Sequence, residues 1–183
     1  PMRLILCAAT LALAAATTAL AAPTADQPWV SVTLDPDGES ALINATIDIP
    51  APAQKVWSAM TDCNATRAMI RSLVQCRVVK AGDGWDVREH VTRGGPLWPS
   101  FRYVFRSDYE TGRRIRFRKL DGNLKTFEGE WDLAPLNGGQ ATRVRYQTRM
   151  GARIFAPPVL VRAGLRKDTP RVLEALRQVA TGG

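Results

Sequence analysis

The groups that could do chemistry in this 183-residue chain are few. Its single histidine, His90, follows Glu89 in the segment WDVREHVT, and no Ser-His-Asp set can be assembled around it. One histidine with a few cysteines and no convergent acidic residues does not have the spacing of a metal site. The sequence also has no glycine-rich phosphate-binding loop. We therefore expect no metal, no cofactor and no assigned catalytic residue.

Glu89 is the best candidate for an acid/base group. Alternation along the segment from Trp85 to Val91 places Glu89 on the apolar face of a strand and His90 on the polar face, as an ordinary surface residue. Burial beside Trp85 and other aromatic residues would raise the pKa of the Glu89 carboxyl. Alternatively, Glu89 pairs with a nearby arginine or a tyrosine hydroxyl and has only a structural role.

These residues belong to a predicted antiparallel sheet. The segment SALINATIDIPA alternates apolar and polar residues and ends at prolines, which predicts a first strand. Six further alternating segments follow, separated by short turn signals such as Asp121-Gly122-Asn123. They cover residues 74–81, 85–92, 101–109, 113–120, 124–133 and 141–150. The sequence therefore predicts seven strands, the last six joined as a meander.

Three segments have the apolar spacing of helices. Two short ones, PAQKVWSAM and ATRAMIRSL, lie between the first and second predicted strands. The third, PPVLVRAGLRKDTPRVLEALRQVA, ends the chain, and Pro170 is expected to kink or restart it because proline lacks a backbone donor. An antiparallel sheet with one apolar face needs a cover, and this last helix is the only predicted element long enough.

The alternation gives the sheet one apolar face, which is either a packed core or the wall of a ligand cavity. Its large aromatic residues exceed what one helix needs for cover, and Glu89, Tyr103 and Tyr146 add polar groups that could orient a small molecule. We therefore predict an apolar ligand-binding cavity. Its candidate lining residues are Trp85, Val87, Glu89, Phe101, Tyr103, Phe105, Ile115, Phe117, Phe127, Gly129, Trp131, Val144 and Tyr146, with Leu160 from the last helix.

The opposite face is ionic. If the strands pair in sequence order, an acidic row lies between two basic rows, so that many charges neutralise one another across strands. The excess of arginine leaves a second interpretation, peripheral contact with an anionic membrane. Nucleic acid is not expected as a partner, because the aromatic residues that would stack on bases lie on the other face. The rows are Arg114, Arg116 and Arg118; Glu128, Glu130 and Asp132; and Arg143, Arg145 and Arg149.

The N-terminal residues predict export. Met2-Arg3 is a short basic start, residues 4–20 are uncharged and rich in Ala and Leu, and Ala19-Leu20-Ala21 is typical of a cleavage site. We expect residues 1–22 to be a cleavable secretory signal peptide, with a periplasmic or secreted location; a membrane anchor is the alternative. Residues 23–40 form an extended lead-in, and residues 41–181 form one domain.

Removal of the leader would also remove Cys7, which leaves Cys63 and Cys76 as an even pair in an oxidising compartment. A disulfide between them would stabilise the fold by about 3 kcal/mol in the chain-entropy model. Two buried free thiols are the alternative, since spacing alone does not show that the two side chains meet.

Three segments, IDIPAPAQKVWSAMTD, LDGNLKTFEGEWDLAPL and VLVRAGLRKDTPRVLEALRQVA, resemble those of the START-like (SRPBCC) helix-grip superfamily. The similarity is greatest to its polyketide cyclase/dehydrase and coenzyme Q-binding-protein-like branch, and runs from about Ile43 to Val179. It implies an α+β fold: a seven-stranded, curled antiparallel sheet wrapped around a long C-terminal helix, with two small helices between strands 1 and 2. It also implies an elongated cavity for lipids, quinones, sterol-like or polyketide ligands. The superfamily has no shared catalytic residues.

These observations favour a periplasmic carrier or sensor of a hydrophobic small molecule or lipid. Two alternatives stay open: a cyclase/dehydrase-type enzyme that uses a cavity carboxylate, Glu89, and a module whose basic face docks on an anionic membrane. Known quinone-binding and ribosome-acting members of the branch are intracellular, so an export leader and a cysteine pair argue against those roles.

Overall fold

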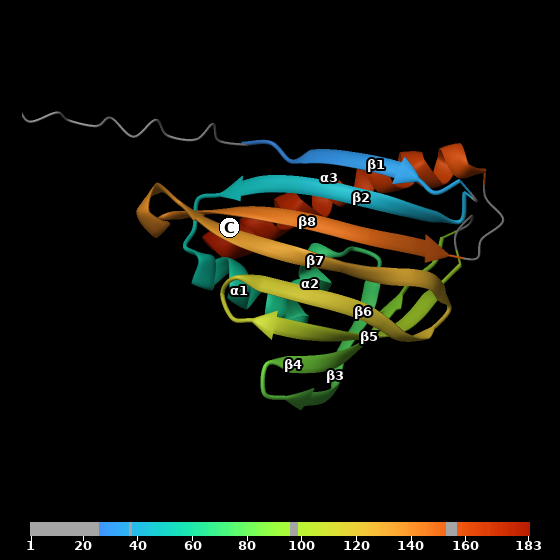
Figure 1. The fold of residues 1–183 in the computed structure, drawn as a ribbon, viewed down its shortest axis with the longest axis horizontal. Coiled ribbons are helices and arrows are strands. Elements are labelled where there is room, and N and C mark those ends of the chain that lie inside the picture. Colours follow the sequence, from blue (N-terminus) through green and yellow to red (C-terminus); the bar gives the residue numbers. More distant parts are fainter. Residues whose placement is uncertain (1–25, 37, 96–98, 153–156) are drawn as a thin grey trace, which may run out of the picture.

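The computed structural model describes residues 26–36, 38–95, 99–152 and 157–183. The predicted signal peptide lies outside them. Within the described residues the chain forms an antiparallel sheet, three α-helices and one short 3-10 turn (Figure 1). The elements are β1 (Trp29–Leu34), β2 (Ser40–Ile49), α1 (Ala53–Thr61), α2 (Cys63–Met69), β3 (Leu73–Gly82), β4 (Trp85–Thr92), β5 (Phe101–Glu110), β6 (Arg114–Gly122), β7 (Leu124–Leu136), η1 (Asn137–Gly139), β8 (Ala141–Ala152) and α3 (Pro158–Thr181).

The strands lie in the order β1-β2-β8-β7-β6-β5-β4-β3, and every neighbouring pair is antiparallel. The predicted meander from β3 to β8 is confirmed. The predicted number of strands is wrong, because the described sheet has eight rather than seven. The additional strand, β1, lies in the lead-in: its Val32 pairs with Ile43 of β2 and is 2% exposed. The two small helices consequently lie between the second and third strands.

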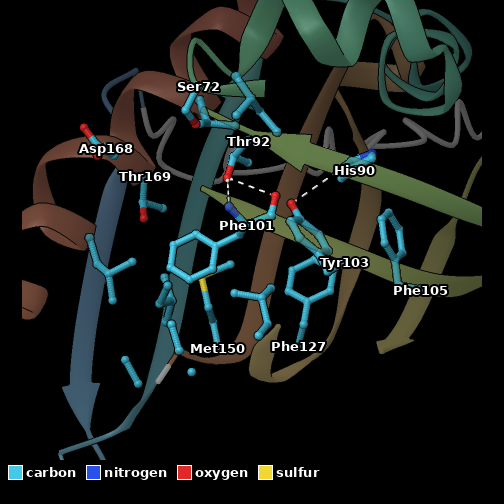
Figure 2. Close-up of a pocket in the computed structure, with 18 of the residues that line it drawn as sticks. Ser72, His90, Thr92, Phe101, Tyr103, Phe105, Phe127, Met150, Asp168 and Thr169 are labelled. Atoms are coloured by element: carbon cyan, nitrogen blue, oxygen red, sulfur yellow. Dashed lines mark hydrogen bonds between the residues drawn. The ribbon is translucent and has the colours of Figure 1, made fainter. Parts of the chain in front are cut away.

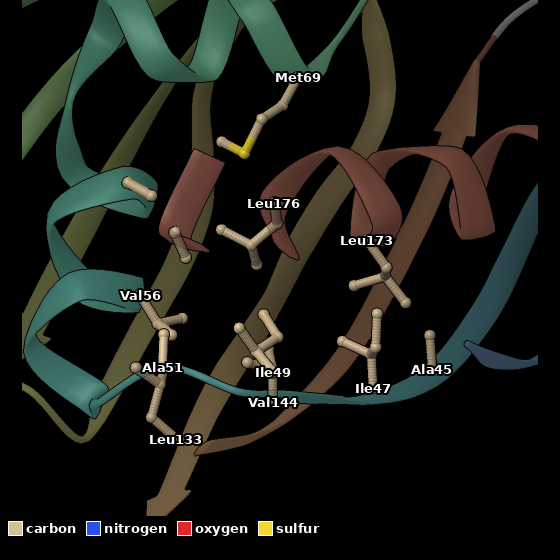
Figure 3. Close-up of a cluster of buried hydrophobic side chains, with 12 residues drawn as sticks. Ala45, Ile47, Ile49, Ala51, Val56, Met69, Leu133, Val144, Leu173 and Leu176 are labelled. Carbon is tan, nitrogen blue, oxygen red and sulfur yellow. The ribbon is translucent and has the colours of Figure 1, made fainter. Parts of the chain in front are cut away.

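The main hydrophobic core lies between the sheet and the C-terminal half of α3 (Figure 3). Leu173 and Leu176 of α3 are each 1% exposed and pack against Ile47 and Ile49 of β2 and against Val144 of β8. α1 adds Val56 to the same cluster. Pro170 lies inside α3, which continues through it as one helix. The predicted cover of the apolar face is therefore confirmed, with α1 as a second contributor.

The two small helices are tied to the sheet. Asp62 caps α2, since its carboxylate accepts a hydrogen bond from the backbone N–H of Ala65 at 2.7 Å. A disulfide joins Cys63, the first residue of α2, to Cys76 of β3, with the two Cα atoms 5.4 Å apart. This link holds α2 beside the edge strand of the sheet.

The outer face of the sheet carries paired charges. Arg114 lies opposite Asp132 and Arg116 opposite Glu130 in the β6–β7 register, and the Arg114–Asp132 pair has an N–O distance of 2.5 Å. Arg143 of β8 pairs with Asp48 of β2 at 2.7 Å. The predicted neutralisation by the acidic row is thus present for Arg114 and Arg116, whereas Arg143 pairs with an acid of β2 instead. No helix among the described residues combines the length and the apolar character needed to cross a membrane.

Candidate functional site: an aromatic cavity under α3

The curled sheet and α3 enclose a cavity of about 770 Å³. Strands β5 to β8 supply one wall, α3 supplies the opposite wall, and α2 and β4 supply the sides. A volume of this size is within the range of small-molecule sites in proteins. Its apolar lining includes Ile43, Phe101, Tyr103, Phe105, Phe117, Phe127, Trp131, Tyr146, Met150, Val161, Leu165 and Val172.

Aromatic rings from neighbouring strands form a continuous wall (Figure 2). The ring centroids of Phe117 and Phe127 are 4.7 Å apart, and those of Tyr103 and Phe127 are 5.0 Å apart. Trp131 and Tyr146 stack with centroids separated by 3.9 Å. Because each ring is held by at least one other, the wall is a preformed apolar surface.

His90 is the most unusual polar group of the lining. It is 5% exposed, its Nδ1 lies 3.3 Å from the Tyr103 hydroxyl, and its Nε2 has no hydrogen-bond partner among the described residues. Burial, assisted by the charge of Arg88, lowers the pKa of His90 to about 4. His90 is therefore neutral at pH 7, and its Nε2 is a buried ring nitrogen whose hydrogen-bonding capacity is not used by the described residues.

The tyrosines of the cavity are also neutral. Burial raises the pKa of Tyr146 to about 12, and burial raises the pKa of Tyr103 further.

Arg88 carries the only fully buried positive charge among the described lining residues, and it is neutralised inside the protein. Its Nε donates to the Asp86 carboxylate at 2.9 Å, and its Nη2 donates to the carbonyl oxygen of Thr61 at 2.6 Å. The polar groups beside the aromatic wall are thus uncharged or, for Arg88, paired internally, while the lining also includes the charged residues Glu39, Arg93 and Asp168.

Along β4 the predicted assignment of faces is wrong. Asp86, Arg88 and His90 are the inward residues, whereas Glu89 lies on the outer face. There the Glu89 carboxylate pairs with Arg77 at 3.0 Å and with Arg102 at 2.5 Å. Hydrogen bonds from these two arginines lower the pKa of Glu89, so the expected rise does not occur. The candidate acid/base group does not reach the cavity.

The other predicted residues divide into two sets. The first set lines the cavity as expected: Phe101, Tyr103, Phe105, Ile115, Phe117, Phe127, Trp131 and Tyr146. Among the rest, Trp85 lies over the guanidinium of Arg106 with its ring centroid 4.3 Å from that group, and Val87 is half-buried outside the lining. Val144 belongs to the packed core, and Leu160 points outward with 53% of its surface exposed.

Gly129 also lies outside the lining, for a steric reason. A Cβ at this position would lie 2.7 Å from Cα of Thr148 and 3.0 Å from Cζ of Phe117. The glycine therefore allows β7 and β8 to approach closely and leaves no pocket of its own.

Several lining residues were not identified from the sequence. Besides Arg88 and His90, these include Thr66 and Met69 of α2, Ser107 of β5, and Val161 and Gly164 of α3. The β4–β5 register, in which His90 lies opposite Tyr103, is the signal that would have revealed His90. No cluster of three or more potential metal ligands occurs in the part of the chain that the structure describes.

Comparison with known families agrees with this geometry. Residues 49–177 match the family described as polyketide cyclase / dehydrase and lipid transport. The match covers more than half of the chain, and the chain therefore belongs to this family. Among curated proteins, no sequence matches the chain significantly.

Solved structures of START-like proteins have the same fold. The human StarD13 lipid transfer and protein localization domain is 14% identical with a TM-score of 0.69, and 87% of each chain is covered. The Zhui aromatase/cyclase from Streptomyces sp. R1128 is 17% identical with a TM-score of 0.65, covering 78% of this chain and 94% of that one. A STAR-related lipid transfer protein from Xanthomonas axonopodis is 19% identical with a TM-score of 0.64, covering 83% and 98%. These likenesses establish the helix-grip fold.

Proposed function

We propose that this protein binds a hydrophobic small molecule, such as a lipid, quinone or polyketide-like compound, as a carrier or sensor. The observation that carries the proposal is the cavity of about 770 Å³, walled by aromatic rings and containing a few uncharged polar groups. Burial of apolar ligand surface supplies affinity, while His90 and the tyrosine hydroxyls can fix the ligand's orientation.

The names of the structural neighbours support this class of ligand. One is a lipid transfer domain, one a STAR-related lipid transfer protein and one an aromatase/cyclase. We further propose that the protein acts in the periplasm or outside the cell. Support comes from the signal-peptide pattern of residues 1–22 and from the Cys63–Cys76 disulfide, which is typical of oxidising compartments.

The direct test is to identify what the protein carries. Protein isolated from the periplasm of its own host is analysed by native mass spectrometry, and bound compounds are extracted with organic solvent. We expect an adduct of one apolar compound per chain. A protein that contains no extractable compound and does not bind a neutral apolar probe, N-phenyl-1-naphthylamine, would contradict the proposal.

A cavity-filling variant separates interior binding from surface binding. Met150 points into the cavity (Figure 2), so Met150→Trp should occupy part of the ligand space and weaken probe binding by about tenfold or more. Leu120→Trp is the matched control, because Leu120 is 48% exposed and does not line the cavity. Equal affinities for the two variants would place the probe outside the cavity.

An enzyme is the second candidate, favoured by the neutral, partly unpartnered imidazole of His90 beside Tyr103. A group with this protonation state can accept a proton from a bound ligand. If the protein transforms its ligand, wild type and His90→Gln isolated from the same host will carry compounds of different mass. A carrier will contain the same compound in both. Glu89→Gln is the control, because the Glu89 side chain lies outside the cavity and should leave the compound unchanged.

Contact of the ionic sheet face with an anionic membrane has weaker support. Arg114 and Arg116 pair with acidic residues on the same face, which reduces the charge available to lipid headgroups.

A further inference from the structure

The N-terminal half of α3 has two faces with different roles. Val161, Gly164 and Leu165 line the cavity. On the outer face, Val159 is 69% exposed and Leu160 is 53% exposed, the two highest values among the large aliphatic residues of the described chain. Burial against the rest of the fold therefore does not explain these two side chains.

Unpaired cations flank the exposed aliphatic residues. Arg162, Arg166 and Lys167 are exposed and form no ion pair with any residue that the structure describes. Arg162 and Arg166 lie one turn apart on one flank of the helix, and Lys167 lies on the other flank, two turns after Leu160. Residues 158–167 contain three basic and no acidic residues. This arrangement contrasts with the ion-paired arginines of the sheet.

We propose that this outer face of α3, the α3 patch (Val159, Leu160, Arg162, Ala163, Arg166 and Lys167), docks on an anionic lipid bilayer. An apolar strip flanked by cations matches the boundary between acyl chains and negatively charged headgroups. The long basic side chains can extend their charges toward the headgroups while their stems cover apolar surface. The local charge of +3, without any acid, favours an anionic surface over a protein partner of mixed charge.

The patch lies at one end of the cavity. Pro158, the first residue of α3, lies beside Gly38 in the β1–β2 connection, and both residues line the cavity together with Thr169. Docking through the patch would therefore bring this end of the cavity to the membrane surface, with only the first turns of α3 between them. A role of docking in ligand exchange rests on the proposed function, but docking itself does not require a ligand.

Vesicle co-sedimentation of the full chain tests the proposal. The vesicles contain about one third phosphatidylglycerol, or phosphatidylcholine alone. We expect binding to the anionic vesicles only, and a loss of about tenfold or more when salt rises from about 0.05 M to about 0.5 M. The triple variant R162E/R166E/K167E should reduce binding by at least about tenfold. The variant V159S/L160S should weaken binding several-fold at constant charge.

A second triple variant controls for net charge. K55E/R67E/R118E changes the net charge by the same amount. Its three cations are exposed, lie outside α3 and form no ion pair with any residue that the structure describes. We expect it to retain most of the binding. Equal losses in the two triple variants, or undiminished binding of R162E/R166E/K167E, would overturn the proposal. Circular dichroism and thermal unfolding establish that all variants are folded. All variants share the same N-terminal sequence, so any contribution of that sequence to vesicle binding is the same in each.

The ligand content of each variant separates this proposal from the proposed function. If both are correct, R162E/R166E/K167E still binds N-phenyl-1-naphthylamine but no longer sediments with anionic vesicles. A wild-type protein that sediments with vesicles but never binds an apolar molecule would retain the docking site and contradict the ligand-binding role.

Discussion

His90 illustrates how the cavity controls a single side chain. Its low pKa arises because the folded protein holds the imidazole away from water and near Arg88. The unfolded chain exposes the same group to water, where its pKa returns to about 6.5. Between these two pH values the unfolded chain binds more protons than the folded protein. The contribution of neutral His90 to stability is therefore fully present above about pH 6.5 and is lost as pH falls toward 4.

This difference predicts a pH-dependent effect of His90→Phe. Wild type should lose about 3 kcal/mol more of its unfolding free energy than the variant between pH 7 and pH 4, because only wild type must bury a proton-binding imidazole. Urea unfolding at several pH values measures both proteins, and the remaining titrating groups are common to them. Parallel stability curves would show that His90 titrates normally in the folded state.

The same residue shows why sequence reasoning misplaced part of the site. Alternation assigned Trp85, Val87 and Glu89 to the apolar face because they are the more hydrophobic set. In the structure, Arg88 donates to the Asp86 carboxylate inside the protein, while Trp85 stacks on Arg106 outside. Pattern alone does not reveal such pairings. The connection between β4 and β5 is also too long to fix their register in the way that a two-residue turn would.

Gly129 acts at the scale of paired strands. We expect Gly129→Ala to lower the unfolding free energy by about 1–3 kcal/mol, because the added Cβ would press on the backbone of Gln147 and Thr148. Gly95→Ala is a suitable control, since a Cβ there meets nothing within 4 Å. It should change stability by no more than about 0.5 kcal/mol. If Gly129→Ala altered probe affinity without a loss of stability, the glycine would shape the cavity after all.

The α2–β3 connection depends on the disulfide. In C63S/C76S the unfolded chain regains the entropy of an open loop, and we expect the unfolding free energy to fall by about 3 kcal/mol. Urea unfolding with and without reductant measures this effect. Reductant should destabilise wild type by a similar amount and leave the double variant unchanged. Equal stability of wild type and variant in the absence of reductant would mean that the two thiols are free in the purified protein.

Most elements could be predicted because their patterns are local. Strands β3 to β8 alternate with turn signals between them, and α3 repeats aliphatic residues at helical spacing. β1 was missed because only its pairing along β2 distinguishes it from an extended segment. Likewise, Leu160 was placed in the cavity from helical spacing, but the rotation of α3 about its axis is set by tertiary packing and turns this side chain outward.

At the scale of the whole molecule, α3 divides the space above the sheet into core and cavity. Its C-terminal half carries Leu173 and Leu176, which fill the volume next to β2 and β8. Its N-terminal half presents Val161, Gly164 and Leu165 to the cavity, opposite the aromatic wall of the sheet. The volume left between them is a property of two surfaces that meet only in the folded protein, and the sequence pattern of either surface does not contain it.

A ligand in this volume should stabilise the entire fold, because the cavity exists only in the folded state. At a probe concentration about 100 times its Kd, we expect the unfolding free energy to rise by about 2.7 kcal/mol. Thermal unfolding of delipidated protein, with and without N-phenyl-1-naphthylamine, measures this rise as an increase in Tm. Leu120→Trp should show the full increase at the same probe concentration, whereas Met150→Trp should show less, since its weaker affinity lowers the ratio of probe to Kd. A probe that binds by fluorescence but leaves the Tm unchanged would be bound equally well by the unfolded chain, which is incompatible with a site built between the sheet and α3.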